Sequence, residues 1–245
     1  MSTPAGAWFI TAGQHVIRYM DAQNRDYAAI TKRMKYLGNE IQALKQSAVA
    51  PGDGERLSRD LKQLMSESES HSFLFVWSIV ITVTLVESYL LEVLVWAAQY
   101  QPDLMKKSEQ SVRYEEALAV DSIEDLRMKM RYKWARSFLD GGGPRKWMER
   151  LAKMGARGFD DKLADSLEET WGMRHAIVHR AGVVSSEMVR RHPRFESKLG
   201  KPLDLDDMDP DFVAKCEVFV GVVDDHFEKR CRSAVAGPGK GGPGA

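Results

Sequence analysis

Cysteine, net charge and strand-like alternation are all scarce in this chain of 245 residues. Its only cysteines, Cys216 and Cys231, are too few for a disulfide-stapled scaffold or a four-cysteine zinc site. They lie roughly 22 Å apart if the intervening stretch is helical, a gap that no disulfide spans. Lysine plus arginine and aspartate plus glutamate number 35 each, so bulk charge alone attracts neither nucleic acid nor an anionic membrane.

We expect no secretory leader, because residues 1–10 lack a basic flank followed by a long apolar run. The most apolar segment, residues 73–98, is interrupted by Glu87 and Glu92. Its uninterrupted part covers 14 residues, against roughly 20 for a membrane span. We therefore expect a buried helix in a soluble cytoplasmic protein that binds no membrane.

Helical periodicity runs through nearly the whole chain, whereas the two-residue alternation of a strand is nearly absent. The predicted helices cover residues 14–47, 55–67, 71–100, 121–139, 145–155, 160–180 and 210–232, with an interruption at 66–70. The predicted fold class is all-α. We expect an N-terminal helical extension over 1–65, a main helical domain over 66–232, and a disordered Gly/Pro-rich tail over 233–245.

Charge is unevenly distributed despite the neutral total. Residues 127–157 hold ten basic and two acidic residues, and residues 174–201 hold seven basic and two acidic ones. Such blocks create either a positive surface for nucleic acid or a solvated helix face. The candidate RNA-binding residues are Arg180, Lys129, Lys133, Arg136 and Lys146.

The chemistry concentrates in one stretch, where Arg174 and His175 precede His179 and Arg180. An arginine offers a permanent charge and a planar donor fork that matches two phosphate oxygens. A histidine gives or takes a proton near neutral pH. Together they could cleave RNA without a metal, because the substrate's 2′-hydroxyl is already a nucleophile. The protein need supply only proton transfer and stabilisation of charge on the phosphorane.

Helix geometry constrains this cluster. His175 and His179 share a face, but Arg174 and His179 lie about 140° apart around a straight helix. They do not converge on one phosphate from a single regular helix. Either the helix is distorted, or a second copy related by a twofold axis completes the site.

The run Arg-His-Ala-Ile-Val-His-Arg-Ala-Gly resembles the signature of HEPN domains, which has an arginine, a polar residue and then a histidine. Arg174, His175 and His179 fill these places. The surroundings resemble the RiboL-PSP type of HEPN: an apolar helix with Glu87, then a helix with a Ser-Ile-Glu-Asp-Leu start, and finally a Gly-Lys-Pro-Leu-Asp-Leu segment at 200–205. The resemblance covers roughly residues 70–232.

This resemblance implies an all-α bundle that dimerises around the motif helix. It implies metal-independent endoribonuclease activity, often as the toxin of a toxin–antitoxin pair or in defence against phage. By position, Arg174 would stabilise the scissile phosphate and His179 would be general acid or base. His175 would orient the site or bind RNA, and Glu87 would support an Arg or His from another helix. The implied partners are RNA, a second copy and possible antitoxin proteins.

Other functions remain open. Some HEPN proteins have lost activity and bind RNA or a protein partner, and residues 14–65 could form an interaction element. The spacing of His175 and His179 also suits zinc, but Ala176 stands where the metalloprotease motif has glutamate, and no nearby ligands complete a set. No Walker-type loop is present, because Gly141–Gly143 precede a proline. We expect no metal and no cofactor.

Overall fold

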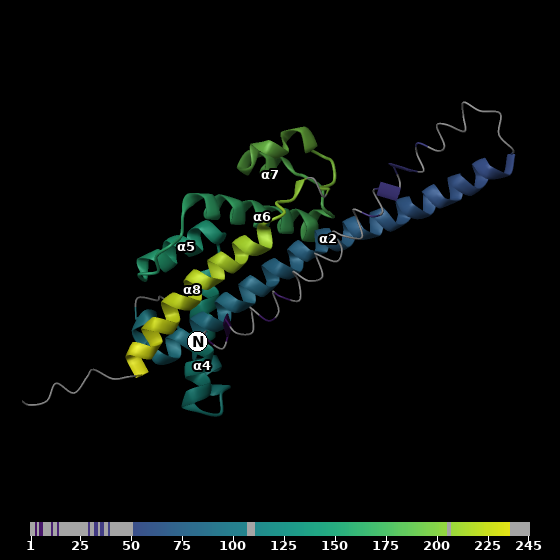
Figure 1. The fold of residues 1–245 in the computed structure, drawn as a ribbon. Helices are drawn as coiled ribbons and strands as arrows, with labels where there is room; N and C mark the ends of the chain where they lie inside the picture. The colour runs from purple at the N-terminus through teal and green to yellow at the C-terminus, as the bar shows by residue number, and fades with distance from the viewer. Residues whose placement is uncertain are drawn as a thin grey trace, which may run out of the picture. The chain divides into compact units, whose positions relative to one another are not determined.

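The computed structural model describes residues 51–106, 111–204 and 207–235, together with a few isolated positions before residue 51 (Figure 1). Its elements are α2 (Pro51–Tyr100), the 3₁₀ helix η1 (Pro102–Met105), α3 (Tyr114–Leu118), α4 (Ile123–Leu139), α5 (Pro144–Lys153), α6 (Asp161–Arg180), α7 (Ser186–Arg191), the 3₁₀ helix η2 (Pro193–Lys198) and α8 (Phe212–Val235). The described part has no strand, only an isolated antiparallel bridge between Val183 and Pro202. The all-α prediction is therefore confirmed.

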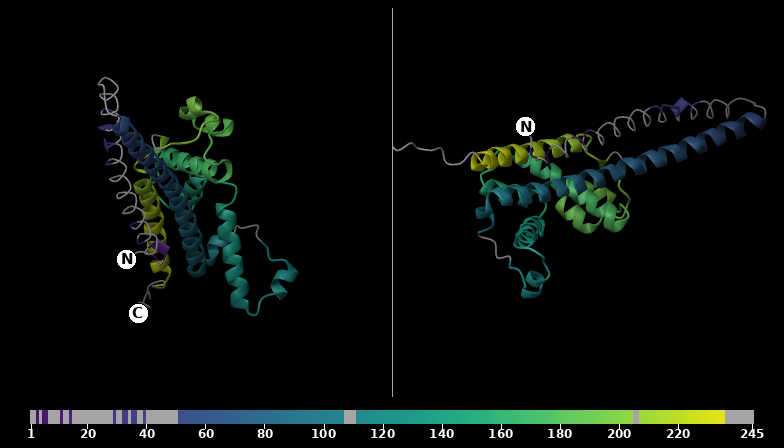
Figure 2. Two further views of the ribbon diagram at one scale, coloured as in Figure 1. Left: turned by 90° about the vertical axis from the view of Figure 1, so that its right-hand side faces the viewer. Right: turned by 90° about the horizontal axis from the view of Figure 1, so that it is seen from below.

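One helix is longer than the sequence indicated. The interruption predicted at residues 66–70 is wrong, because α2 continues through it as one unbroken helix, as both views in Figure 2 show. Serine and glutamate weaken a helix only slightly, so their cluster does not end one. The domain boundary at residue 65 stays a prediction. The helix predicted over 14–47 and residues 236–245 of the predicted tail lie outside the described residues, while residues 233–235 belong to α8.

The other helices follow their capping signals closely. α4 begins after Ser122 rather than at Asp121, because the Ser122 side chain accepts a hydrogen bond from the Asp125 amide at 3.1 Å. Pro144 opens α5, where its fixed φ and missing N–H suit the first turn. α4 and α6 end at the predicted residues, Leu139 and Arg180.

The described chain divides into two compact units. Unit 1 contains residues 82–172 and 209–245 with the first thirteen residues, and unit 2 contains residues 14–81 and 173–208. α6 supplies its first half to unit 1 and its second half to unit 2. The Arg/His motif belongs to unit 2.

Unit 1 has an extensive apolar core. Along α2, Val86, Leu90, Val93 and Ala97 are fully buried at helical spacing. α8 contributes a matching apolar face, and α4, α5 and α6 add tryptophans and leucines. Burial of this cluster removes apolar surface from water, which favours the packing of these helices.

A buried carboxylate lies beside that core. Asp224 of α8 accepts a hydrogen bond from the Tyr89 hydroxyl of α2 at 3.3 Å and from the backbone amide of Thr3 at 3.2 Å. Burial, together with the neighbouring carboxylate, raises the pKa of Tyr89 far above its usual value, so the phenol keeps its proton and stays a donor. The buried charge is thus supplied with partners.

α2 also meets a length and composition test for membrane spans. Within Val76–Tyr100, the most apolar stretch of 18 residues has a mean hydropathy of 1.9, and 56% of that stretch is buried within the protein. Core helices pass this test as well as membrane helices do. The fully buried residues of α2 in unit 1 account for much of its apolar character.

Candidate functional site

The second half of α6 separates buried and exposed residues on opposite faces. Met173, Ala176 and Ile177 are buried, which fixes that face in the protein interior. His175 and the last three residues of the helix, Val178, His179 and Arg180, are exposed. The sequence therefore directs the two histidines outwards simply by alternating them with apolar residues at helical spacing.

The two histidine rings are in direct contact. The ring centroids of His175 and His179 lie 4.7 Å apart, and the ring planes are inclined at 47°. The pKa of His175 lies below its ordinary value, mainly because of partial burial and then because of His179. Arg180 and Arg174 lower this pKa further, whereas the Glu187 carboxylate raises it.

Arg174 has an unusual environment for an arginine. Its side chain is half-buried, and its Nε is buried without a hydrogen-bond partner among the described residues. A buried donor without a partner is costly, because its hydration has been removed without compensation. Among the described residues, this Nε is therefore a donor that an anionic ligand would satisfy.

The end of α6 is held by the segment that follows it. Ala181 and Gly182 have φ angles of +52° and +79°, which turn the chain sharply after the motif. The Val184 amide then donates to the Lys201 carbonyl at 2.9 Å, and the Leu203 amide donates to the Gly182 carbonyl at 2.9 Å. Residues 182–184 and 201–203 therefore meet at this bridge.

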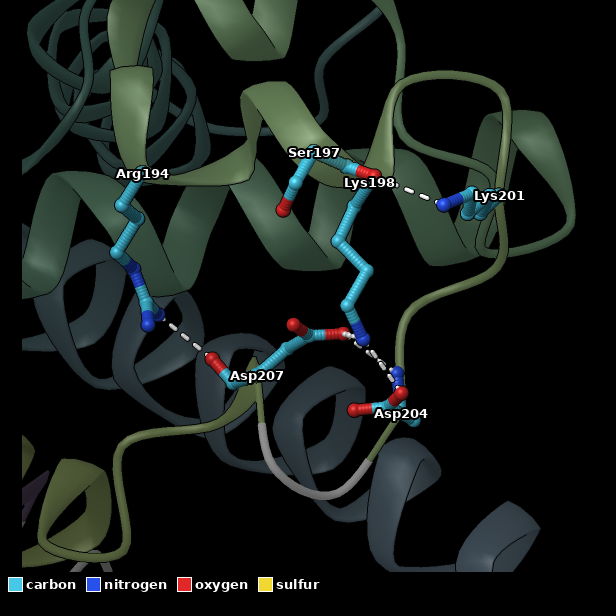
Figure 3. A network of polar contacts seen from close by, with 6 residues as sticks. All are labelled: Arg194, Ser197, Lys198, Lys201, Asp204 and Asp207. Carbon is cyan, nitrogen blue, oxygen red and sulfur yellow. Dashed lines mark hydrogen bonds and ion pairs between the residues drawn. The ribbon is translucent and has the colours of Figure 1, made fainter.

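A polar network joins Arg194 and Lys198 of η2 to Asp204 and Asp207 (Figure 3). Lys198 points between two carboxylates, at 2.5 Å from Asp204 and 3.2 Å from Asp207. The Asp207 carboxylate also accepts from the Asp204 amide at 2.8 Å, and its carbonyl accepts from Arg194 at 2.6 Å. The Asp207 side chain is only 10% exposed, and Asp207 is hydrogen-bonded to residues 194, 198 and 204.

Glu87 has a different partner from the Arg or His expected of it. Its carboxylate accepts a hydrogen bond from the Trp171 indole nitrogen at 3.0 Å, and both residues belong to unit 1. The Trp171 ring packs edge-on against Trp147 at 5.5 Å. Glu87 therefore holds the segment of α6 that directly precedes the motif, and its role at a site stays a prediction.

The basic block of residues 127–157 is partly neutralised within unit 1. Its ion pairs join Arg127 and Arg131 to Glu124, Lys133 to Glu116, and Arg145 to Asp161 and Asp165. Among the predicted RNA-binding residues, Lys133 is thus already paired, and Lys146 donates to the Gly141 carbonyl at 3.0 Å. Lys129 and Arg136 are exposed on α4.

The structure thus places Arg174, His175, His179 and Arg180 on the second half of α6, where only the two histidine rings are in contact, while Glu87 and the other predicted RNA-binding residues belong to unit 1. Sequence reasoning did not single out Glu187, which affects His175 from α7. Helical periodicity could not have found it, because the turn after Arg180 breaks the register between the two helices. In the part of the chain that the structure describes, no group of three or more His, Cys, Asp or Glu side chains is arranged to hold a metal ion.

No family model, curated protein or solved structure matches the chain.

Proposed function

We propose that this chain is a metal-independent endoribonuclease of the HEPN type, with Arg174, His175 and His179 in its active site. The observation that carries the proposal is the exposed histidine pair beside an arginine whose Nε has no hydrogen-bond partner among the described residues. An imidazole pair supplies proton transfer near neutral pH, and a guanidinium supplies charge for a phosphate. These are the groups that RNA transesterification requires from a protein.

Each group has a defined role in the proposed reaction. The Arg174 guanidinium donates hydrogen bonds to the phosphate and stabilises the negative charge that develops on it. The histidines remove the proton of the 2′-hydroxyl and supply one to the leaving 5′-oxygen, a contribution of roughly 10²–10⁴-fold. The products are a 2′,3′-cyclic phosphate and a 5′-hydroxyl.

A second copy of the chain completes the proposed site. α6 is an uninterrupted α-helix from Asp161 to Arg180, which disfavours the alternative of a distorted motif. Arg174 and His179 then lie about 140° apart on one helix. A twofold axis near α6 would place the arginine of one copy beside the histidine of the other.

RNA contacts in this proposal come first from Arg180, Lys129 and Arg136, which are exposed. Lys133 and Lys146 contribute less, because both have partners within the protein. Glu87 acts through Trp171 by holding α6. A toxin or phage-defence role, with an antitoxin protein as partner, belongs to the same proposal.

The test is incubation of the purified protein with single-stranded RNA in EDTA. We expect cleavage to a cyclic phosphate by the wild type, and a loss of at least about 100-fold in Arg174→Ala and His179→Ala. The matched control is Arg190→Ala, an exposed arginine of α7 that should cleave normally. Cleavage that is equal in all variants, or that stops in EDTA, would overturn the proposal.

RNA binding without cleavage would instead favour a non-catalytic RNA-binding module. In that case affinity should fall steeply with salt, as the release of counterions requires. For the cellular role, expression should be toxic and His179→Ala should relieve the toxicity. Toxicity that is unchanged in that variant would remove the nuclease as its cause.

A further inference from the structure

Three described residues near the start of the chain are docked against the core of unit 1. Thr3 and Gly6 are buried, and Ala5 packs against the apolar cluster. Threonine, alanine and glycine carry little apolar surface, so apolar burial contributes little at these three positions. The polar contacts that they make are therefore the larger contribution there.

These polar contacts converge on one carboxylate, that of Asp224 on α8. One carboxylate oxygen accepts from the backbone amide of Thr3 at 3.2 Å, and the other accepts from the Thr3 hydroxyl. The oxygen of that hydroxyl in turn accepts from the Gly6 amide at 2.9 Å, as the side chain of an N-cap residue does. A single hydroxyl group thus joins the helical residue Gly6 to α8.

This close approach requires a glycine at position 6. A Cβ atom at Gly6 would overlap the Asp224 carboxylate. Gly221 on α8 is different, because a Cβ atom there would meet no other atom within 4 Å. The hydroxyl of Thr3 and the missing side chain of Gly6 are therefore two separate features that fit the same carboxylate.

The core around Asp224 has contacts that do not involve these residues. The Tyr89 hydroxyl of α2 donates to Asp224 at 3.3 Å, so α2 and α8 are joined at this carboxylate. Leu90 of α2 and Phe219 of α8 are fully buried in the apolar cluster. Within the described part of the chain, the buried members of that cluster begin at Val86. We therefore expect the core to persist when Thr3 is displaced.

We propose that Thr3, Gly6 and Asp224 form a latch that fastens the first residues of the chain to unit 1, and that this latch opens without unfolding the core. Opening exchanges the two bonds from Thr3 for bonds to water and leaves Tyr89 as a donor to the carboxylate. The residues around Thr3 are therefore a strap that opens locally. The latch does not depend on the proposed ribonuclease function.

The test is native-state hydrogen exchange of the full-length protein, measured by NMR at single amides. Gly6→Ala should open the latch and accelerate exchange at the Thr3 amide roughly ten- to hundredfold, because this amide loses a bond to a charged acceptor. The Leu90 amide in the core should keep its protection. The matched control is Gly221→Ala, which should leave the Thr3 amide unchanged because its methyl group has room.

Variants of Thr3 and Asp224 test the polar bonds without adding volume. Thr3→Val removes the hydroxyl and keeps the shape of the side chain, so exchange at the Gly6 amide should accelerate at least about threefold. Thr3→Ser keeps a hydroxyl and should restore the protection. Asp224→Asn removes the charge, and combining it with Thr3→Val should add little, because both changes break the same bond.

The outcomes decide the inference in either direction. Protection of the Thr3 and Gly6 amides that is unchanged in both Gly6→Ala and Thr3→Val would overturn the latch. Equal acceleration at Leu90 would overturn local opening, because the core would then open together with the strap. Acceleration confined to the strap, with recovery in Thr3→Ser, would support the proposal whether or not the protein cleaves RNA.

Discussion

Unit 1 and residues 173–208 of unit 2 differ in how far their packing relies on buried apolar side chains. In unit 1, long helices bury a continuous set of apolar side chains, several of them with no exposed surface. In residues 173–208, short helices and loops bury fewer apolar side chains, among them Val184 and Phe195, and they are also joined by the Val183–Pro202 bridge and by the network around Asp207. The candidate site lies in the second kind of structure, where side chains stay accessible because fewer of them are needed for packing.

This comparison shows where each energetic contribution should be found. Removing apolar volume should matter most in unit 1. Removing one polar side chain should lower the free energy of unfolding most in residues 173–208, where such a side chain accepts a hydrogen bond from a backbone amide. Three substitutions test this division, from the largest expected effect to the smallest.

The largest effect is expected at Leu90 of α2, which is fully buried in the apolar core. Leu90→Ala removes buried apolar volume and leaves a cavity, so the free energy of unfolding should fall by about 3–4 kcal/mol. Denaturant unfolding measures the change. The matched control is Leu118→Ala on α3, where the leucine is 69% exposed and the loss should stay below about 0.5 kcal/mol. Equal losses in the two variants would contradict the assignment of the core.

A smaller effect is expected at Asp207. Asp207→Ala removes the acceptor for Lys198 and for the Asp204 amide, at a cost of about 2 kcal/mol. Hydrogen exchange should accelerate at the Asp204 amide, which loses its acceptor on the Asp207 carboxylate. In the control Asp204→Ala, the carboxylate is 54% exposed, and the loss should be only about 0.5 kcal/mol. Unchanged exchange in Asp207→Ala would show that the bridge alone maintains the loop.

The smallest effect is expected at Ala181, which has a φ of +52°. Ala181→Gly should stabilise the protein by about 0.5 kcal/mol, because glycine adopts this conformation without a steric cost. In α5, the exposed Ala152 is helical, and Ala152→Gly should destabilise by about 1 kcal/mol. Thermal unfolding of the two variants gives the sign of each change. A destabilising Ala181→Gly would mean that the methyl group makes contacts that outweigh the strain.

Much of the helical architecture could be predicted from the sequence, because it depends on local signals. Pro144 predicted where α5 begins, and the apolar spacing of residues 73–98 predicted a helix that forms part of α2. The interruption predicted at residues 66–70 is wrong, because a composition rich in serine and glutamate does not by itself end a helix. The turn after Arg180 could also be anticipated, since Gly182 follows the motif directly.

The site was predictable only in part, because some of its contacts are local in the sequence and others are not. His175 and His179 are close because four positions make one helical turn, so their contact follows from the sequence. The hydrogen bond from the Trp171 indole to the Glu87 carboxylate joins residues far apart in the chain, and no local pattern indicates it. The pairing of Lys133 with Glu116 likewise depends on tertiary structure, and it changes how much of the basic block remains available.

The bridge between Val183 and Pro202 has a consequence for how the chain can vary. It holds the two ends of the intervening segment beside each other, so α7 and η2 lie in a closed loop of the chain. The entropic cost of closing such a loop grows only with the logarithm of its length. Insertions between residues 184 and 200 should therefore leave the end of α6 in place, which makes this segment the natural location for grafting new sequence next to the motif.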